Sequence, residues 1–139
     1  DYGQVVAMFF HSVLTSSTIH IHNNGLQTRS FTWIDDITDG FLKAGLLDLG
    51  VSGASLSGMA FNIGSTEEIS ILDLQKRVYE VVEADSNWSL PLPEVDFTDG
   101  YHGDATRRWP DVSLATHHLG WTPSTSLMEG LQSTWFALR

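Results

Sequence analysis

The sequence predicts an α/β fold, in the form of one small mixed domain of helices and short strands. Segments with apolar residues at helical spacing are followed along the chain by short segments in which apolar and polar residues alternate or β-branched residues dominate. This order is typical of mixed folds. The length of 139 residues and an apolar content of 42% suffice for one continuous core, but not for two large domains. No repeat or low-complexity tract interrupts the pattern. We therefore expect residues 1–139 to form a single domain.

Two helices and two strands are expected in the first third of the chain. Residues 5–14 carry apolar side chains at helical spacing, which predicts a helix with one broad buried face. Residues 18–22 alternate and favour a strand, and the Asn-Asn-Gly after them predicts a turn in which Gly25 or an asparagine takes positive φ. Residues 28–34 predict a second strand. A helix then runs through about Leu47, capped by Asp35 or Asp36, with an inner stripe of Ile37, Phe41, Ala44 and Leu47 or Leu46.

Further short elements are expected in the rest of the chain. A small-residue loop at about 50–58 predicts flexibility, and a short buried strand follows at 59–64. Ser70 caps a helix over 71–84, and another strand is expected at 88–92. The last expected elements are a helix over 111–119 that ends at Gly120 and a helix over 126–138 that begins with a capping box of Ser126 and Glu129.

The charge balance and the lack of cysteine exclude several classes of function. Seventeen acidic residues against seven Lys and Arg give a net charge of −10, which disfavours binding to nucleic acid or to an anionic membrane. No apolar run approaches the ~18 residues of a membrane span. Without cysteine there are no disulfides or thiolate metal sites, and a cytoplasmic location is expected. His20 and His22 share one strand face but lack an evident third metal ligand, and no Gly-x-Ser-x-Gly elbow supports a serine nucleophile.

Three arginines stand outside the expected helix surfaces. Arg29 enters a strand beside a polar turn, and Arg107 and Arg108 lie in an irregular stretch at about 93–110. Loops of this length are uncommon unless they bind something. Converging guanidinium groups can neutralise a diphosphate through paired donors. Pairing with nearby acids, such as Asp35, Asp36, Asp104 or Asp111, is at least as probable from the residues alone.

Three motifs, taken in order, resemble one family of enzymes. They are QTRSFTWIDDITDGFLKA at 27–44, FNIGSTEEISILDLQKRV at 61–78 and RRWPDVSLATHHLGWTPSTSLMEGL at 107–131. In this order and spacing they are similar to the carboxyl-terminal half of extended short-chain dehydrogenase/reductases that act on nucleotide sugars. The nearest types are UDP-glucuronate decarboxylases, dTDP-glucose 4,6-dehydratases and related epimerases. The resemblance implies a substrate-binding lobe without its Rossmann domain, over essentially the whole chain.

The resemblance also implies a binding site for a UDP- or dTDP-sugar. Arg29 and Arg108 match the arginines that contact the substrate diphosphate from two sides. The base and sugar pocket would be formed by Val5, Val6, His20, Ile21, His22 and Arg107, with His22 and Asn23 where the family usually has Tyr and Gly. Asp36 matches a family aspartate and is expected to cap a helix, and Asn62 is expected to be a buried residue that satisfies a turn.

Parts that the family needs for catalysis are missing from the chain. No Gly-rich turn that admits a dinucleotide pyrophosphate is present, so NAD(P) would bind a missing half. The family's Tyr-x-x-x-Lys pair is absent as well, because Tyr2, Tyr79 and Tyr101 are followed at that spacing by Val6, Glu83 and Ala105. The chain is therefore expected to hold no catalytic, cofactor-binding or metal residues and to be inactive alone.

Two hypotheses of different class remain open. Under the first, the chain is the nucleotide-sugar binding module of an NAD(P)-dependent epimerase, dehydratase or decarboxylase, and a separate cofactor-binding chain is a possible partner. Under the second, it is a non-catalytic protein of the same ancestry that assembles with itself. A homo-oligomer is expected. An exposed apolar face would favour self-association.

Overall fold

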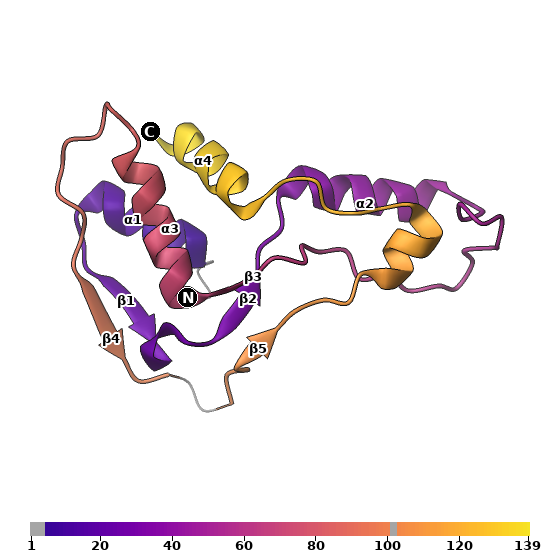
Figure 1. Ribbon diagram of the computed structural model, residues 1–139, viewed down its shortest axis with the longest axis horizontal. Helices are drawn as coiled ribbons and strands as arrows, with labels where there is room; N and C mark the ends of the chain where they lie inside the picture. The colour runs from indigo at the N-terminus through magenta and orange to yellow at the C-terminus, as the bar shows by residue number, and fades with distance from the viewer. Residues whose placement is uncertain (1–4, 101–102) are drawn as a thin grey trace. The chain divides into compact units, whose positions relative to one another are not determined.

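The computed structural model describes residues 5–100 and 103–139, so Tyr2 and Tyr101 lie outside the described residues (Figure 1). Helices and short strands alternate along the chain, which confirms the predicted fold class. The elements are α1 (Val5–Thr15), β1 (Ile19–His22), η1 (Asn23–Gly25), β2 (Thr28–Ser30), α2 (Ile34–Leu46), β3 (Glu68–Ser70), α3 (Ile71–Glu83), β4 (Val95–Thr98), β5 (Arg107–Arg108), η2 (Ala115–Leu119) and α4 (Leu127–Leu138).

The chain divides into two compact units. Unit 1 comprises Asp1–Arg29, Ile69–Arg107 and Leu131–Arg139, and unit 2 comprises Ser30–Glu68 and Arg108–Gly130. The boundary passes through β2, β3 and β5, which form a three-stranded sheet in the order β3-β2-β5. That residues 1–139 form one domain stays a prediction.

Unit 1 is built on a two-stranded parallel sheet. β1 pairs with β4 in a register that joins Ile19 to Val95 and His22 to Thr98. Parallel neighbours need a long crossover connection, and here it includes α3. α1 packs against both β1 and α3 (Figure 1). The side chains that fill the core between them are Phe9, Phe10, Val13, Ile19, Ile21, Leu74, Val78 and Val82.

Unit 2 is built around α2 and η2, which pack against each other. Its core is a cluster of Leu56, Val112, Ala115, Leu119 and Trp121, with Trp121 fully buried. The Trp121 indole N–H donates to the Asp36 carbonyl at 3.0 Å. Glycine is required at position 40 of α2, because a Cβ there would lie 2.5 Å from Ile63 Cγ2.

The helix ends follow the predicted local signals. Ser70 Oγ accepts a hydrogen bond from the Asp73 N–H at 3.0 Å, which confirms the expected cap. Ser126 and Glu129 form the expected capping box, with the Ser126 N–H donating to Glu129 Oε2 at 2.9 Å. Gly120 takes the left-handed conformation, with φ of 59°, at the end of η2.

Several expected elements differ in the structure. The strands expected at 59–64 and 88–92 are absent, and β4 at Val95–Thr98 lies instead within the expected loop. The second expected strand ends at Ser30 because the chain then enters α2, whose N-cap is Trp33 rather than an aspartate. The expected inner stripe of α2 is wrong at Phe41, Leu46 and Leu47, which are 68%, 77% and 40% exposed. No helix among the described residues is long and apolar enough to cross a membrane.

Candidate functional site

Arg29 is fixed by three hydrogen bonds within unit 1. Its Nη1 donates to the carbonyls of Thr28 at 2.7 Å and Ala105 at 2.8 Å, and its Nη2 donates to Asp104 Oδ1 at 2.8 Å. The Arg29 and Asp104 side chains are only 18% and 25% exposed, so this ion pair is less hydrated than an ordinary surface pair. This ion pair is the pairing of an arginine with a nearby acid that the sequence left open as an alternative to diphosphate binding. Since a guanidinium carries five N–H donors, Nε and one N–H of Nη2 have no partner among the described residues.

Arg107 and Arg108 make up the short strand β5, and both are exposed. Within residues 5–100 and 103–139, Arg108 forms no ion pair, so its guanidinium is hydrated. Arg29 and Arg107 belong to unit 1, whereas Arg108 belongs to unit 2. That Arg29 and Arg108 meet on one diphosphate therefore stays a prediction.

The two histidines of β1 lie opposite polar residues of β4. His22 Nδ1 is 2.7 Å from Thr98 Oγ1 and 3.2 Å from the Asp99 carbonyl. Depending on the tautomer, Nδ1 donates to the carbonyl or accepts from the hydroxyl, and either bond orients the ring. His20 Nδ1 lies 3.7 Å from Asp96 Oδ2, and both side chains are mostly exposed. The structure thus brings His22 to the carboxyl end of the parallel pair, with its ring orientation set by β4.

Directly after His22 the backbone makes a left-handed turn. Asn23, Asn24 and Gly25 have φ values of 52°, 56° and 70°, which confirms the expected turn with positive φ. Gly25 is required here for a second reason, because a Cβ would lie 2.9 Å from both Ile21 Cγ2 and Leu72 Cβ. Successive left-handed residues are costly outside glycine and tend to occur at functional sites. This turn therefore fixes the direction in which the chain leaves β1.

The remaining predicted pocket residues differ in their access to a ligand. Val5 and Val6 are half-buried in the first turn of α1. The Ile21 side chain is 1% exposed and belongs to the core, so only its backbone could face a ligand. All the residues predicted for the base and sugar pocket belong to unit 1. Their common role in one pocket stays a prediction.

Asp36 has a different role from the predicted helix cap. Its carboxylate is buried and accepts hydrogen bonds from the Ser124 N–H at 3.2 Å, the Ser124 hydroxyl at 2.7 Å and the Thr125 N–H at 2.9 Å. Burial opposes ionisation, but these donors outweigh it and hold the pKa of Asp36 below its ordinary value. Asp36 therefore fixes the turn before α4, a contact of residues 88 positions apart that no local pattern could reveal.

Asn62 also differs from its prediction. It is exposed rather than buried, and its amide donates to the Asp111 carbonyl at 3.0 Å. The neighbouring Gly64 is buried against Pro110, and a Cβ on it would lie 2.9 Å from Pro110 Cγ. The Asn-x-Gly motif thus contacts the proline and the aspartate that follows it, within unit 2.

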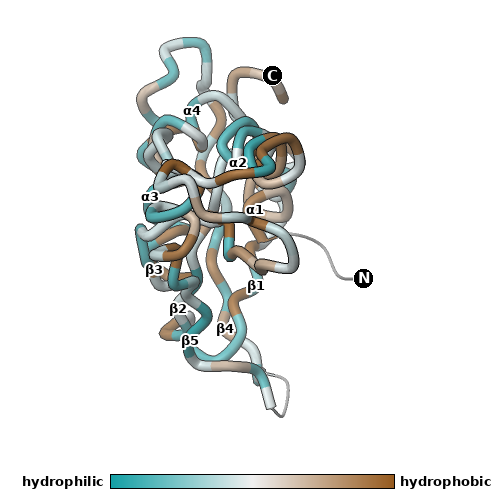
Figure 2. Tube along the Cα trace, turned by 90° about the vertical axis from the view of Figure 1, so that its right-hand side faces the viewer, coloured by the Kyte–Doolittle hydropathy of each residue, from teal (hydrophilic) through white to brown (hydrophobic). Residues whose placement is uncertain are grey.

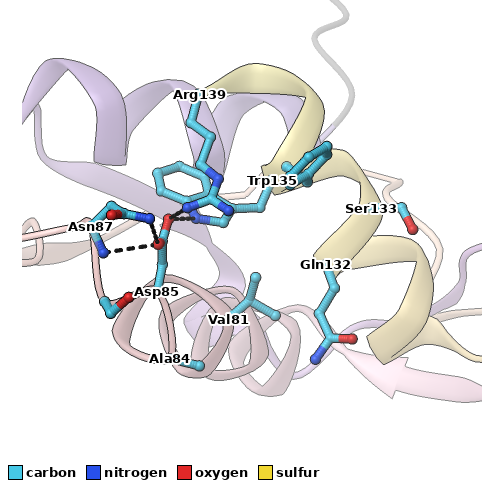
Figure 3. Close-up of a pocket in the computed structure, with 10 residues that line it drawn as sticks. Val81, Ala84, Asp85, Asn87, Gln132, Ser133, Trp135 and Arg139 are labelled. Carbon is cyan, nitrogen blue, oxygen red and sulfur yellow. Dashed lines mark hydrogen bonds and ion pairs between the residues drawn. The ribbon is translucent and has the colours of Figure 1, made fainter.

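A pocket of about 610 Å³ in unit 1 was not marked by the sequence. It lies between the end of α3 and α4, and Figure 3 shows the Asp85 carboxylate bonded to its neighbours, Arg139 among them. The Asp85 side chain is 7% exposed and pairs with Arg139. It also accepts from Trp135 Nε1 at 2.9 Å and from the Asn87 N–H at 3.0 Å. The Asn87 N–H, together with Trp135 and Arg139, holds the pKa of Asp85 below its ordinary value despite burial. Because these donors already occupy the Asp85 carboxylate, it is not offered to a ligand. The hydrogen-bonded cluster instead connects α3 to α4.

No group of three or more His, Cys, Asp or Glu side chains among the described residues could hold a metal ion. The arrangement can orient two cationic or imidazole groups, Arg29 and His22, within unit 1. Such groups bind and orient anionic or aromatic ligands, because guanidinium donors match phosphate oxygens.

Comparisons with known proteins relate the chain to UDP-sugar enzymes. No family model matches it. UDP-glucuronic acid decarboxylase 2 of Arabidopsis thaliana is 30% identical over 131 residues, which cover 94% of the chain and 26% of the relative. UDP-glucose 4-epimerase of Mycolicibacterium smegmatis is 32% identical over 130 residues, or 94% of the chain and 37% of the relative.

Solved structures give the same result. UDP-glucuronic acid 4-epimerase from Bacillus cereus, in complex with UDP-glucuronic acid and NAD, matches 96% of the chain and 38% of its own length, with a TM-score of 0.80 and 27% identity. UDP-glucose 4-epimerase from Thermotoga maritima, with UDP-glucose, matches 99% and 40% at the same TM-score and 28% identity. The fold and these matches are similar to part of the extended short-chain dehydrogenase/reductases. Within that class the chain matches a carboxyl-terminal fragment of the UDP-sugar epimerases and decarboxylases, as predicted. It spans from 26% to 40% of the length of these relatives.

Proposed function

We propose that the chain is the nucleotide-sugar binding module of an NAD(P)-dependent epimerase, dehydratase or decarboxylase. The observation that carries this proposal is the match over 94% of the chain to enzymes whose names specify UDP-sugars. The solved relatives hold UDP-glucuronic acid or UDP-glucose, which favours UDP-sugars over dTDP-sugars as ligands of this chain. A cytoplasmic location is part of the proposal, because the chain has no cysteine.

Arg29 and Arg108 are the proposed contacts to the diphosphate. Arg29 supports this role because Asp104 and Ala105 hold its guanidinium in place, while two of its N–H donors have no partner within residues 5–100 and 103–139. A preorganised donor loses less conformational entropy on binding than a freely rotating one. Arg108 supports the role through its exposed and unpaired charge within the described part of the chain. His22, oriented by Thr98, is the proposed neighbour of the base.

Catalysis is proposed to need a second component that binds NAD(P). Tyr79 is the described tyrosine that could be compared with a catalytic base, but it has Glu83 where the family has lysine. Its hydroxyl donates to the Pro93 carbonyl, and burial raises the pKa of this phenol above its ordinary value. Both features disfavour proton abstraction by Tyr79 at neutral pH. The chain alone would then bind substrate without turnover.

Titration calorimetry with UDP, UDP-glucose and UDP-glucuronic acid tests the proposal. Arg108→Ala should weaken binding of all three ligands by roughly 10- to 150-fold, because a hydrogen bond to a charged group is worth about 1.5–3 kcal/mol. Uridine, which has no phosphate, should bind equally to both proteins.

The matched control is Arg77→Ala, an exposed arginine on α3 that pairs with Glu80. It removes the same charge from the chain without touching the proposed site, so binding should be unchanged. A chain that binds none of the UDP ligands at millimolar concentration would contradict the proposal. Equal effects of Arg108→Ala and Arg77→Ala would contradict the role of Arg108.

Self-association is the second candidate function, and exposed apolar side chains favour it. Phe41, Leu46 and Val51 of unit 2 are 68%, 77% and 68% exposed. Groups of such residues mark interaction surfaces. Sedimentation at several protein concentrations separates the candidates, since a self-assembling protein forms oligomers without any UDP-sugar. A monomer that binds UDP-glucose would exclude this second function.

A further inference from the structure

The pocket between the end of α3 and α4 lies away from His22, the proposed neighbour of the base. Its volume of about 610 Å³ is within the roughly 300–1,000 Å³ of typical small-molecule sites. Figures 1 and 2 both place the α4 residues of unit 1 at one end of this unit and the carboxyl end of β4 at the other. His22 pairs with Thr98 at that carboxyl end. A ligand in the pocket would therefore use other residues than a nucleotide sugar held by His22.

Three polar side chains that line the pocket have hydrogen-bonding capacity that the protein does not use. The Gln132 amide and the hydroxyls of Ser86 and Ser133 form no hydrogen bond within residues 5–100 and 103–139. Figure 3 shows Gln132 and Ser133 on α4 without a bond to the other residues drawn. A glutamine amide offers an acceptor and two donors, and each hydroxyl both donates and accepts. The pocket thus presents donors and acceptors together.

An aromatic surface borders these polar groups. Phe136 is 71% exposed, and the Arg139 guanidinium lies over its ring, 5.3 Å from the centroid. This cation–π contact favours one orientation of the ring. Trp135 lies beside it and is buried, with its indole N–H bonded to Asp85 at 2.9 Å. The surface of the pocket therefore combines a held aromatic ring with free polar groups.

The charges in the pocket cancel each other. Asp85 and Arg139 are the charged residues among those that line it, and they form an ion pair. The chain as a whole carries a net charge of −10, which repels anions. A ligand without net charge is therefore favoured over a phosphorylated or carboxylated one.

We propose that this pocket binds a neutral saccharide of one or two rings. Sugar hydroxyls both donate and accept hydrogen bonds, which suits the Gln132 amide and the hydroxyls of Ser86 and Ser133. The C–H face of a sugar ring is apolar and packs on an aromatic side chain such as Phe136. The inference is independent of the proposed function, because it uses neither Arg29 nor Arg108.

Titration of the full chain with glucose, galactose and maltose tests the proposal, with proton–nitrogen correlation spectra of the tryptophan indoles as the readout. The Trp135 indole signal should move to saturation with a dissociation constant on the order of a millimolar, as expected for a small ligand in an open site. Trp121 provides the internal control, since its indole N–H is buried in unit 2 and bonded to the Asp36 carbonyl. Its signal should not move.

Two substitutions locate the site. Phe136→Ala and Gln132→Ala should each weaken maltose binding at least roughly fivefold, and both side chains are exposed, so the fold should be kept. Phe41→Ala is the matched control, because Phe41 is 68% exposed in unit 2, and it should leave binding unchanged.

Three results would overturn the proposal. The first is a Trp135 signal that none of the three sugars moves to saturation. The second is maltose binding that neither Phe136→Ala nor Gln132→Ala weakens. The third is tighter binding of glucose 1-phosphate than of glucose, which would contradict the preference for a neutral ligand. None of these results concerns UDP, so failure here is distinct from failure of the proposed function.

Discussion

At the scale of single residues, the buried carboxylate of Asp36 shows how far a side chain can act from its own element. It belongs to α2 but accepts hydrogen bonds from Ser124 and Thr125. The sequence pattern correctly predicts its position near the helix start but wrongly predicts a cap, because the hydrogen-bond partners are distant in the chain. Arg29 likewise has a contact with a distant residue that the sequence does not reveal. Its charge and position were visible in the sequence, whereas its bond to the Ala105 carbonyl was not.

Asp36→Asn should destabilise the protein by roughly 1–3 kcal/mol, because the amide NH₂ would face a backbone N–H donor in place of an acceptor. The free energy of unfolding in urea measures this change. Asp39→Asn is the matched control on the same helix, since Asp39 is exposed and forms a surface ion pair with Lys43 at 2.8 Å. Its effect should stay below about 0.5 kcal/mol. Equal effects of the two substitutions would show that the Asp36 contacts do not stabilise the fold.

At the scale of elements, local signals were predicted well and non-local ones poorly. The Ser70 cap, the capping box at Ser126 and the left-handed Gly120 depend on residues within one turn, so the sequence contains them in full. The pairing of β1 with β4 depends on residues far apart, and β4 was assigned to a loop. The buried face of α2 was predicted wrongly for the same reason. Helical spacing shows which residues share a face of the helix, but not which face packs against another element.

The turn after β1 should tolerate no side chain at Gly25. Gly25→Ala should cost roughly 2–4 kcal/mol, because left-handed strain adds to overpacking against Ile21 and Leu72. Gly53→Ala provides the comparison, because Gly53 has φ of 77° with open space around it. Gly53→Ala should lower the free energy of unfolding only by the strain of the left-handed backbone, about 1–2 kcal/mol. Chemical denaturation of both variants gives the two values, and equal losses would argue against the crowding at Gly25.

The cap of α3 should contribute a smaller amount. Ser70→Ala removes the acceptor of the Asp73 N–H and should lower the free energy of unfolding by about 1 kcal/mol. Ser57→Ala serves as its control, because the Ser57 hydroxyl is exposed and makes no hydrogen bond within the described residues. Thermal unfolding followed by circular dichroism compares them, and a Ser70 variant as stable as the Ser57 variant would exclude the cap as a stabilising contact.

At the scale of the whole molecule, the acidic composition predicts how stability depends on pH. The pKa values of Asp36, Asp73, Asp85, Asp111 and Glu129 are held below the ordinary 3.8 for Asp and 4.5 for Glu. A lowered pKa means that the unfolded state binds protons first as pH falls. Stability should therefore be constant from about pH 5 to about pH 7 and decrease progressively below pH 5.

Urea unfolding at several pH values between about 2.5 and 7 measures this dependence. Asp36→Asn should flatten the acid limb of the curve, because it removes one of the groups that titrates differently in the two states. A free energy of unfolding that rises as the pH is lowered from 5 to 3 would contradict the assignment of these carboxylates.

The parallel pairing of β1 with β4 has a consequence for how the molecule forms. Ile19 meets Val95, 76 positions later, so this ladder closes only after most of the chain is available. Closing so long a loop is slow, and proteins dominated by such distant pairs fold slowly. During synthesis, α1 and β1 emerge long before β4 and must remain without their neighbour. We therefore expect the ring of His22, which Thr98 orients, to reach its position late in folding.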